Sequence, residues 1–272
     1  MLVIGSGLPF LLLPGIHGRW EWHRPTAEAL GRRFRVVTFS LCGDRASGWP
    51  IDPIVGFDCH LAQIDARLDQ AGVAQPIVIG GISYGGLAAL RYAAMRPARV
   101  GALVLASTPA PSWRPEPWVR RWAGWPRLYA PAFGLMAVRR MWPELLATFR
   151  SPGAALRFMA RHAIRIGLAP MSTRAMGQRV HLLDGCDFVA DARRINVPTL
   201  VTTGEPGLDR VVPVAGTREY VELIPGARHV TIAGTGHVGV VSRADHFATI
   251  VGEFVDQLGG SPVPDRRQSI PP

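Results

Sequence analysis

Short apolar runs alternate with segments of helical period along most of this chain. Runs of four to eight apolar residues bounded by turn formers predict strands at 9–13, 34–39, 76–80, 100–106, 197–203 and 229–233. Helical spacing predicts helices at 57–71, 85–95, 214–223 and 243–258. Strand–helix alternation requires crossover connections, which are right-handed. The expected fold class is therefore α/β, with a mostly parallel central sheet flanked by helices.

The alternation stops after residue 109 and resumes near residue 195. Residues 110–194 show no strand pattern, and they hold fourteen arginines against five acidic residues, with five of the eight tryptophans. We expect a core of residues 1–109 and 195–258, split by an all-helical cap at 110–194. Prolines 115, 117, 126, 131 and 143 predict that this cap is broken into short helices. The Gly/Pro/Ser-rich end, 259–272, is expected to be a disordered tail.

Composition limits the class of protein. With 48% hydrophobic and 18% charged residues, the 272-residue chain can build a core, which excludes global disorder. The net charge of +10 comes from arginine alone, and there is no lysine. This charge indicates either an anionic partner or simply a GC-rich coding sequence, and no nucleic-acid motif accompanies it.

Cysteine usage and the apolar segments bear on the compartment. Three distant cysteines, Cys42, Cys59 and Cys186, exclude a disulfide scaffold and a zinc ribbon, and indicate a reducing compartment, the cytoplasm. Residues 1–16 are uncharged, but they lack the basic start of a signal peptide and are punctuated by glycine and proline. Residues 70–90 are interrupted in the same way and do not predict a membrane helix.

The motif Gly81-Ile82-Ser83-Tyr84-Gly85 is a G-x-S-x-G placed directly between a predicted strand and a predicted helix. Such a junction forces a tight turn in which the serine side chain projects from the sheet edge, and only small residues fit two positions away on either side. The alternative is a glycine-rich phosphate-binding turn. That alternative lacks the lysine of a P-loop and the spacing of G-x-G-x-x-G. Ser83 is therefore the predicted nucleophile.

A serine hydroxyl needs a base, and the base needs a carboxylate to hold its tautomer. His237 lies in a glycine-rich loop after the last strand, where it can reach the serine across the sheet edge. Two acids follow the strand at 197–203. Asp209 is the favoured partner of His237, and Glu205 is the alternative acid.

Donors for an oxyanion are expected from backbone amides. His17-Gly18 follows the first strong strand, so that the next amide, that of Arg19, can point at the nucleophile together with the amide of Tyr84. His17 itself is expected to pack the loop.

Together these residues resemble the α/β-hydrolase superfamily, in its serine-nucleophile branch with a helical cap. The order Ser83, Asp209, His237 is similar to the family's order of serine, acid and histidine. The resemblance implies a cofactor-independent serine hydrolase, without metal, that cleaves a carboxylic ester, thioester or lactone of a small molecule through an acyl-serine. The alternatives are a C–C bond hydrolase, acyltransferase or lyase on the same fold, or a non-catalytic ligand-binding or membrane-associated module.

Arginine and tryptophan in the cap indicate an anionic or lipid-like substrate, or contact with an anionic membrane surface. The competing explanation is that the tryptophans fill the cap's own core and the arginines are solvated. Neither the oligomeric state nor the substrate follows from these motifs, because caps diverge within a fold.

Overall fold

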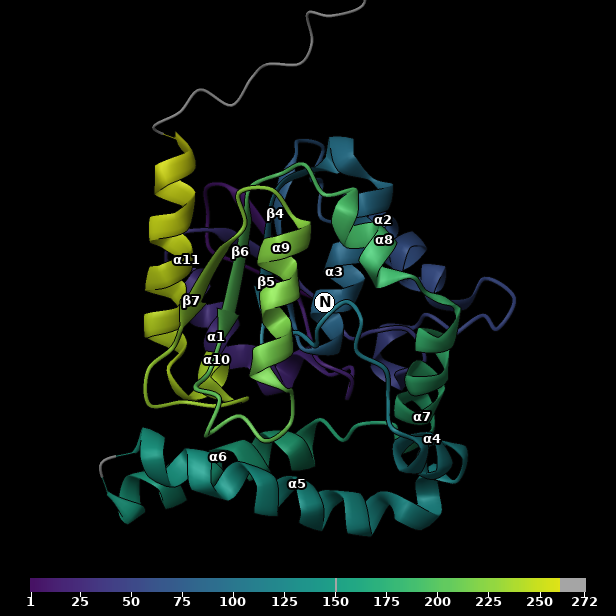
Figure 1. Cartoon of the computed structure of the whole chain (residues 1–272), viewed down its shortest axis with the longest axis vertical. Helices are drawn as coiled ribbons and strands as arrows, with labels where there is room; N and C mark the ends of the chain where they lie inside the picture. Colours follow the sequence, from purple (N-terminus) through teal and green to yellow (C-terminus); the bar gives the residue numbers. More distant parts are fainter. Residues whose placement is uncertain (150, 260–272) are drawn as a thin grey trace, which may run out of the picture.

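A single seven-stranded sheet organises the computed structural model, which describes residues 1–149 and 151–259 (Figure 1). Its strand order is β1-β3-β2-β4-β5-β6-β7. The edge strand β1 pairs antiparallel with β3, and every other pairing is parallel. The α/β architecture expected from the sequence is therefore confirmed. The strands are β1 (Leu2–Ile4), β2 (Pro9–Leu13), β3 (Arg35–Thr38), β4 (Ile77–Ile82), β5 (Val100–Ala106), β6 (Thr199–Thr203) and β7 (Arg228–Thr231).

Helices cover both faces of the sheet, because the strand side chains alternate between two buried clusters. Leu11 and Leu13 of β2 belong to one cluster, while Phe10 and Leu12 belong to the other. The first cluster is closed by α2 (Cys59–Gln70), α3 (Tyr84–Met95), α8 (Phe188–Arg193) and α9 (Glu219–Leu223). The second is closed by α1 (Arg24–Leu30), α10 (Gly239–Ser242) and α11 (Ala244–Gly259).

The predicted core elements are all present, with boundaries shifted by a few residues. The strand predicted at 76–80 runs on to Ile82, and the Ser83 amide still donates to the Ala106 carbonyl at 2.8 Å. The sequence analysis did not predict α1 or the single turn α10. Gly259, assigned above to the tail, is the last residue of α11, and the remainder of that predicted tail lies outside the described residues.

Between β5 and β6, the described residues form four α-helices before α8, and we call these the inserted helices. They are α4 (Pro117–Gly124), α5 (Pro126–Thr148), α6 (Pro152–Leu168) and α7 (Thr173–Leu182). Figure 1 shows α5 and α6 lying together across one end of the sheet. Within the described part of 110–194 there is no strand, as the sequence predicted.

The prediction that proline breaks this segment into short helices is wrong for α5. This helix is continuous over 23 residues although Pro131 and Pro143 lie inside it. Each internal proline removes one backbone hydrogen bond, but the neighbouring turns and the packing of α5 against α4, α6 and α7 hold the helix together. Proline marks the starts correctly, because α4, α5 and α6 each begin at a proline, where no donor is needed.

The end of the inserted region belongs to the core packing. Phe188 and Ala192 of α8 lie in the same buried cluster as the strands, and α8 packs against α3. No helix among residues 1–149 and 151–259 is long and apolar enough to span a membrane.

Candidate active site

Ser83 occupies a strained turn at the junction of β4 and α3. Its φ of 55° and ψ of −120° lie in a region that glycine normally occupies. A Cβ on Gly81 would lie 2.0 Å from the Gly85 carbonyl oxygen, and a Cβ on Gly85 would lie 2.5 Å from the Pro14 oxygen. The close approach of backbone to backbone therefore explains why the motif needs both glycines. The turn leaves the Ser83 side chain half-buried at the carboxyl end of β4.

His237 and Asp209 are brought together from two separate loops. Asp209 Oδ2 lies 3.3 Å from His237 Nδ1, while its Oδ1 accepts hydrogen bonds from the amides of Val211 and Val212, both at 2.9 Å. Burial alone would raise the pKa of Asp209, but the His237 hydrogen bond, its charge and the two amides outweigh burial and lower that pKa. Asp209 is therefore held as a carboxylate beside the imidazole.

Glu205, the alternative acid, has a different partner. Its Oε1 accepts the Gly234 amide at 2.7 Å, and its own amide donates to the Thr235 carbonyl at 2.8 Å. Glu205 thus fixes the backbone that leads to His237, whereas Asp209 contacts the imidazole itself. The geometry favours Asp209 as the acid.

The Arg19 amide does not serve as the sequence analysis expected. It donates to His17 Nδ1 at 3.1 Å, and the Arg19 guanidinium pairs with Asp44 and Glu21, both at 2.7 Å. Gly15 and Ile16, four and three residues earlier, line the same cavity as Ser83. The Ile16 amide has no acceptor among the described residues, which makes it a better candidate donor to an oxyanion than the Arg19 amide. The Tyr84 amide, in the first turn of α3, has no partner within the helix.

The hydrogen bonds of the loop fix the tautomers of two histidines. Because His17 Nδ1 accepts from the Arg19 amide, its Nε2 carries the proton and donates to His23 Nε2 at 3.0 Å. His17 also stacks on Trp22, with ring centroids 4.3 Å apart. Burial lowers the pKa of His17 and lowers that of His23 to about 3, so both rings are neutral. His17 packs the loop, as the sequence analysis expected.

Arg179 of α7 is fully buried and hydrogen-bonds to the backbone of the loop that contains Ile16. Its Nη1 donates to the Ile16 carbonyl at 2.9 Å, and its Nη2 donates to the carbonyls of Leu41 and Cys42 at 3.2 and 2.7 Å. Gly18 has a φ of 76°, and a Cβ there would lie 2.4 Å from Arg179 Nη2. The inserted helices therefore hold the loop in place through one guanidinium.

Ser83 and His237 open into a common cavity of about 300 Å³. Stripes of apolar side chains from α5 and α6 form part of its wall, and none of the described lining residues is an aspartate, glutamate or arginine. The lining residues are Gly15, Ile16, His17, Trp22, His23, Ile82, Ser83, Val138, Met141, Leu145, Phe158, Met159, His162, Ala163, Ile166, His237, Val238, Val240 and Val241. No hydrogen bond joins Ser83 Oγ to His237 in the described part of the chain. Such bonds often tighten only in a substrate complex.

Two cavity-lining histidines, His23 and His162, were missed as site residues by the sequence analysis. His162 lies on α6 one turn after Phe158, on the apolar stripe that faces the cavity. That spacing is the signal that could have identified it. His23 sits at the end of a short helical turn, and nothing in the sequence marks its position.

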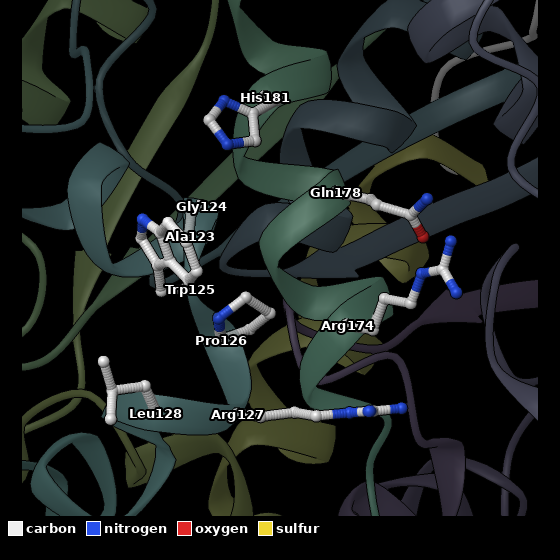
Figure 2. A pocket seen from close by; sticks show the side chains of 9 residues that line it. All are labelled: Ala123, Gly124, Trp125, Pro126, Arg127, Leu128, Arg174, Gln178 and His181. Atoms are coloured by element: carbon white, nitrogen blue, oxygen red, sulfur yellow. The ribbon is translucent and has the colours of Figure 1, made fainter.

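Cationic side chains of the inserted helices gather in a second, open cavity of about 620 Å³, between the α4–α5 junction and α7. Figure 2 shows Arg174 and Gln178 one turn apart on α7, extending to the same side as Arg127. Trp125, at the junction, is 68% exposed. The basic charge of this region thus lies away from the lining of the Ser83 cavity.

One cluster has donor types suited to a metal ion. Ligand atoms of Cys42, Cys59 and His60 lie within 4.8 Å of one another. However, Cys42 Sγ lies 3.1 Å from Gln63 Oε1, and His60 Nε2 lies 2.9 Å from the Tyr84 hydroxyl. Hydrogen bonding to Cys59 and burial raise the pKa of the Cys42 thiol, which therefore stays protonated. Cys42 and His60 are thus each hydrogen-bonded to residues outside this cluster, and His60 Nδ1 has no partner among the described residues.

Three curated proteins are similar to more than nine-tenths of this chain. A Poly(3-hydroxyalkanoate) depolymerase of Ectopseudomonas oleovorans is 30% identical over 92% of this chain and 84% of its own length. A Pimeloyl-[acyl-carrier protein] methyl ester esterase of Xanthomonas axonopodis is 28% identical over 93% of this chain and 97% of its own. The polyketide synthase ThaQ of Burkholderia thailandensis is 29% identical over 93% of this chain, which spans only 12% of that protein.

Among solved structures, the enol-lactonase of Burkholderia xenovorans superimposes with a TM-score of 0.75 at 23% identity. The match covers 94% of this chain and 95% of that one. The family described as the alpha/beta hydrolase fold matches residues 9–244. The chain therefore belongs to the α/β-hydrolase family.

Proposed function

We propose that this protein is a serine hydrolase that cleaves a carboxylic ester or lactone through an acyl-serine. The observation that carries the proposal is the placement of Ser83. It sits in a strained turn at the end of β4 and faces the same cavity as His237, whose Nδ1 lies beside the Asp209 carboxylate. A serine hydroxyl becomes a nucleophile when a neighbouring imidazole accepts its proton.

The arrangement assigns each group a role. The Asp209 carboxylate favours a proton on His237 Nδ1, which leaves Nε2 free to take the proton of Ser83 Oγ as Oγ attacks the carbonyl carbon. The amides of Ile16 and Tyr84 are the candidate donors to the oxyanion. His237 then protonates the leaving group, and water activated by His237 releases the acyl group from Ser83.

The inserted helices α5 and α6 act in this proposal as the cap that selects the substrate. Val138, Met141 and Leu145 of α5 bring apolar side chains to the cavity, and Phe158 and Met159 of α6 do the same. A volume of 300 Å³ equals about ten water molecules in the liquid, which suits an acyl group of roughly ten non-hydrogen atoms. Because a buried charge would have no partner in this lining, the acyl group is uncharged.

Relatives of this chain support the bond type. The similar proteins include a methyl ester esterase and a poly(3-hydroxyalkanoate) depolymerase. A thioester could be attacked by the same serine, and we include it in the substrate range to be tested. No observation at the site favours C–C cleavage, acyl transfer or lyase chemistry. The three cysteines are unpaired and buried, which supports a reducing compartment, the cytoplasm.

The test is a panel of p-nitrophenyl esters of increasing acyl length, with lactones and thioesters alongside, and fluorophosphonate labelling. We expect labelling at Ser83 and the best kcat/KM for uncharged acyl groups of intermediate length. Ser83→Ala should abolish both labelling and turnover. If Ser83→Ala retains more than a few per cent of turnover, or if the wild-type protein does not label, the serine-hydrolase proposal is wrong and a non-catalytic binding role gains support.

The basic surface of the inserted helices supports a second part of the proposal, an anionic leaving group or partner outside the cavity. Arg127 and Arg174 line the second cavity together with the exposed Trp125 (Figure 2). Screening shortens the reach of such charges to about 8 Å at physiological ionic strength, so kcat/KM for an ester with an anionic leaving group should fall as salt rises. A neutral ester of the same size should change little. Equal salt dependence for both esters, with no sedimentation on anionic vesicles, would leave the arginines as solvated surface residues.

A further inference from the structure

Glu144 is a buried carboxylate near the end of α5. It is only 1% exposed, and it forms no ion pair with any lysine or arginine of the described residues. Burial raises the pKa of Glu144 to about 7, although the amides of Gly236 and Val238 and the charge of His237 oppose the rise. Burying a carboxylate in a helix that only covers an apolar cavity would cost folding free energy. A carboxylate in this position therefore needs a specific partner.

The partner is the loop that carries His237. Glu144 Oε1 accepts the amide of Val238, the residue directly after His237, at 2.8 Å. One turn further along α5, Thr148 Oγ1 donates to the Gly234 carbonyl at 3.0 Å. The Thr148 carbonyl in turn accepts from Arg243 Nη2 at 2.8 Å. The last turns of α5 are thus hydrogen-bonded to the chain on both sides of His237.

These hydrogen bonds matter because few other contacts fix the position of the His237 imidazole. The His237 side chain is half-buried, and its one side-chain partner in the described structure is Asp209, at 3.3 Å. A shift of about 1 Å in a reacting group can cost roughly 100-fold in rate. The peptide that follows His237 is held by Glu144, which belongs to an element 94 residues earlier in the chain.

We propose that Glu144 is a positioning residue for His237, so that the inserted helix α5 forms a structural part of the catalytic apparatus as well as a lid. The inference rests on the proposed hydrolase function. Glu144 acts through the backbone of the loop and does not touch the reacting atoms. Its acceptor oxygen, rather than its bulk, carries the effect.

The experiment compares Glu144→Leu with Glu144→Gln on the best p-nitrophenyl ester. Leucine removes the acceptor of the Val238 amide, whereas glutamine keeps an amide oxygen on a side chain of the same shape. We expect Glu144→Leu to lower kcat by roughly 10- to 100-fold with KM within threefold, and Glu144→Gln to restore kcat to within about fivefold of wild type. Fluorophosphonate labelling of Ser83 should slow in parallel with kcat.

Met141→Ala serves as the matched control, because Met141 lies on the same helix and lines the same cavity but is not among the side chains that bond the His237 loop. It should change KM more than kcat. If Glu144→Leu does not fold, as judged by circular dichroism, Glu144→Ala replaces it under the same expectations.

Two results would overturn the inference. One is a Leu or Ala variant whose kcat stays within threefold of wild type, and the other is a Gln variant as impaired as the Leu variant. Both are distinguishable from failure of the proposed function. If the proposed function itself were wrong, the wild-type protein would neither turn over esters nor label at Ser83.

Discussion

Replacing Ser83 by glycine should stabilise the protein while destroying its activity. Ser83 holds φ 55° and ψ −120°, a conformation that costs a residue with a Cβ about 1 to 3 kcal/mol. Glycine adopts it without that cost, but loses about 0.5 to 1 kcal/mol more backbone entropy on folding. The Ser83 side chain makes no capping bond to α3, so loss of the hydroxyl costs the helix nothing. The net expectation is a gain of about 1 kcal/mol.

The informative comparison is Ser83→Gly against Ser83→Ala. Both variants lack Oγ and should be inactive, but alanine keeps the Cβ and therefore the strain. At an ordinary helical position the order is reversed, and Ala94→Gly in α3 should lower stability by about 1 kcal/mol. Urea unfolding gives the free energies. In calorimetry, Ser83→Gly should melt about 2 °C above Ser83→Ala. If Ser83→Gly is equally or less stable than Ser83→Ala, the turn is not strained and the argument for a stored conformational cost fails.

Three further perturbations follow from the geometry. Asp209→Asn should lower kcat by orders of magnitude, because the wrong imidazole tautomer is favoured. Glu205→Gln keeps an oxygen for the Gly234 amide and should lower kcat less than tenfold. The reverse ranking in steady-state kinetics would move the acid to Glu205. Arg179→Leu removes the guanidinium donor from three backbone carbonyls, of which that of Leu41 still accepts the Asp44 amide. The loss should lower the unfolding free energy in urea by about 3 kcal/mol, and a loss under 1 kcal/mol would show that these hydrogen bonds contribute little. Burial lowers the pKa of His60 to about 3, so the unfolded chain, with a pKa near 6.5, binds the proton first and stability is lost as pH falls from 6.5 toward 3, by about 1.4 kcal/mol per pH unit. His60→Leu should therefore show a shallower loss of stability between pH 6 and 4 than wild type, and parallel curves would contradict the buried neutral imidazole.

The sequence pattern and the structure differ in the loop of residues 15–19. The pair His17-Gly18 looked like the bend that would aim the Arg19 amide at the serine. In the structure that amide donates a hydrogen bond to His17, two residues earlier, and Ile16 lines the cavity instead. Which amide of a short loop stays free depends on hydrogen bonds made by neighbouring side chains. No spacing rule fixes those bonds.

Local chemistry determined strands β2 to β7, helices α2, α3, α9 and α11, and the serine turn. Apolar runs of strand length can be satisfied only inside a sheet, and the two glycines around Ser83 are required by contacts within ten residues or with the adjoining strand. The family order of serine, acid and histidine then followed from the chain order alone. These features depend on interactions between sequence neighbours or between adjacent strands of one sheet, and they were therefore predictable.

Only the tertiary structure decided which distant groups support the site. Glu144 meets the loop of His237 across 94 residues, and Arg179 reaches the Ile16 carbonyl across 163. Both contacts depend on how α5 and α7 settle against the end of the sheet, and the sequence pattern shows each helix only as amphipathic or basic. The apolar lining of the cavity has the same origin, because the packing of α5 and α6 turns their apolar faces toward Ser83 and leaves many of their arginines outside. Helix packing, rather than composition, thus decides what the arginine-rich insertion presents to a substrate.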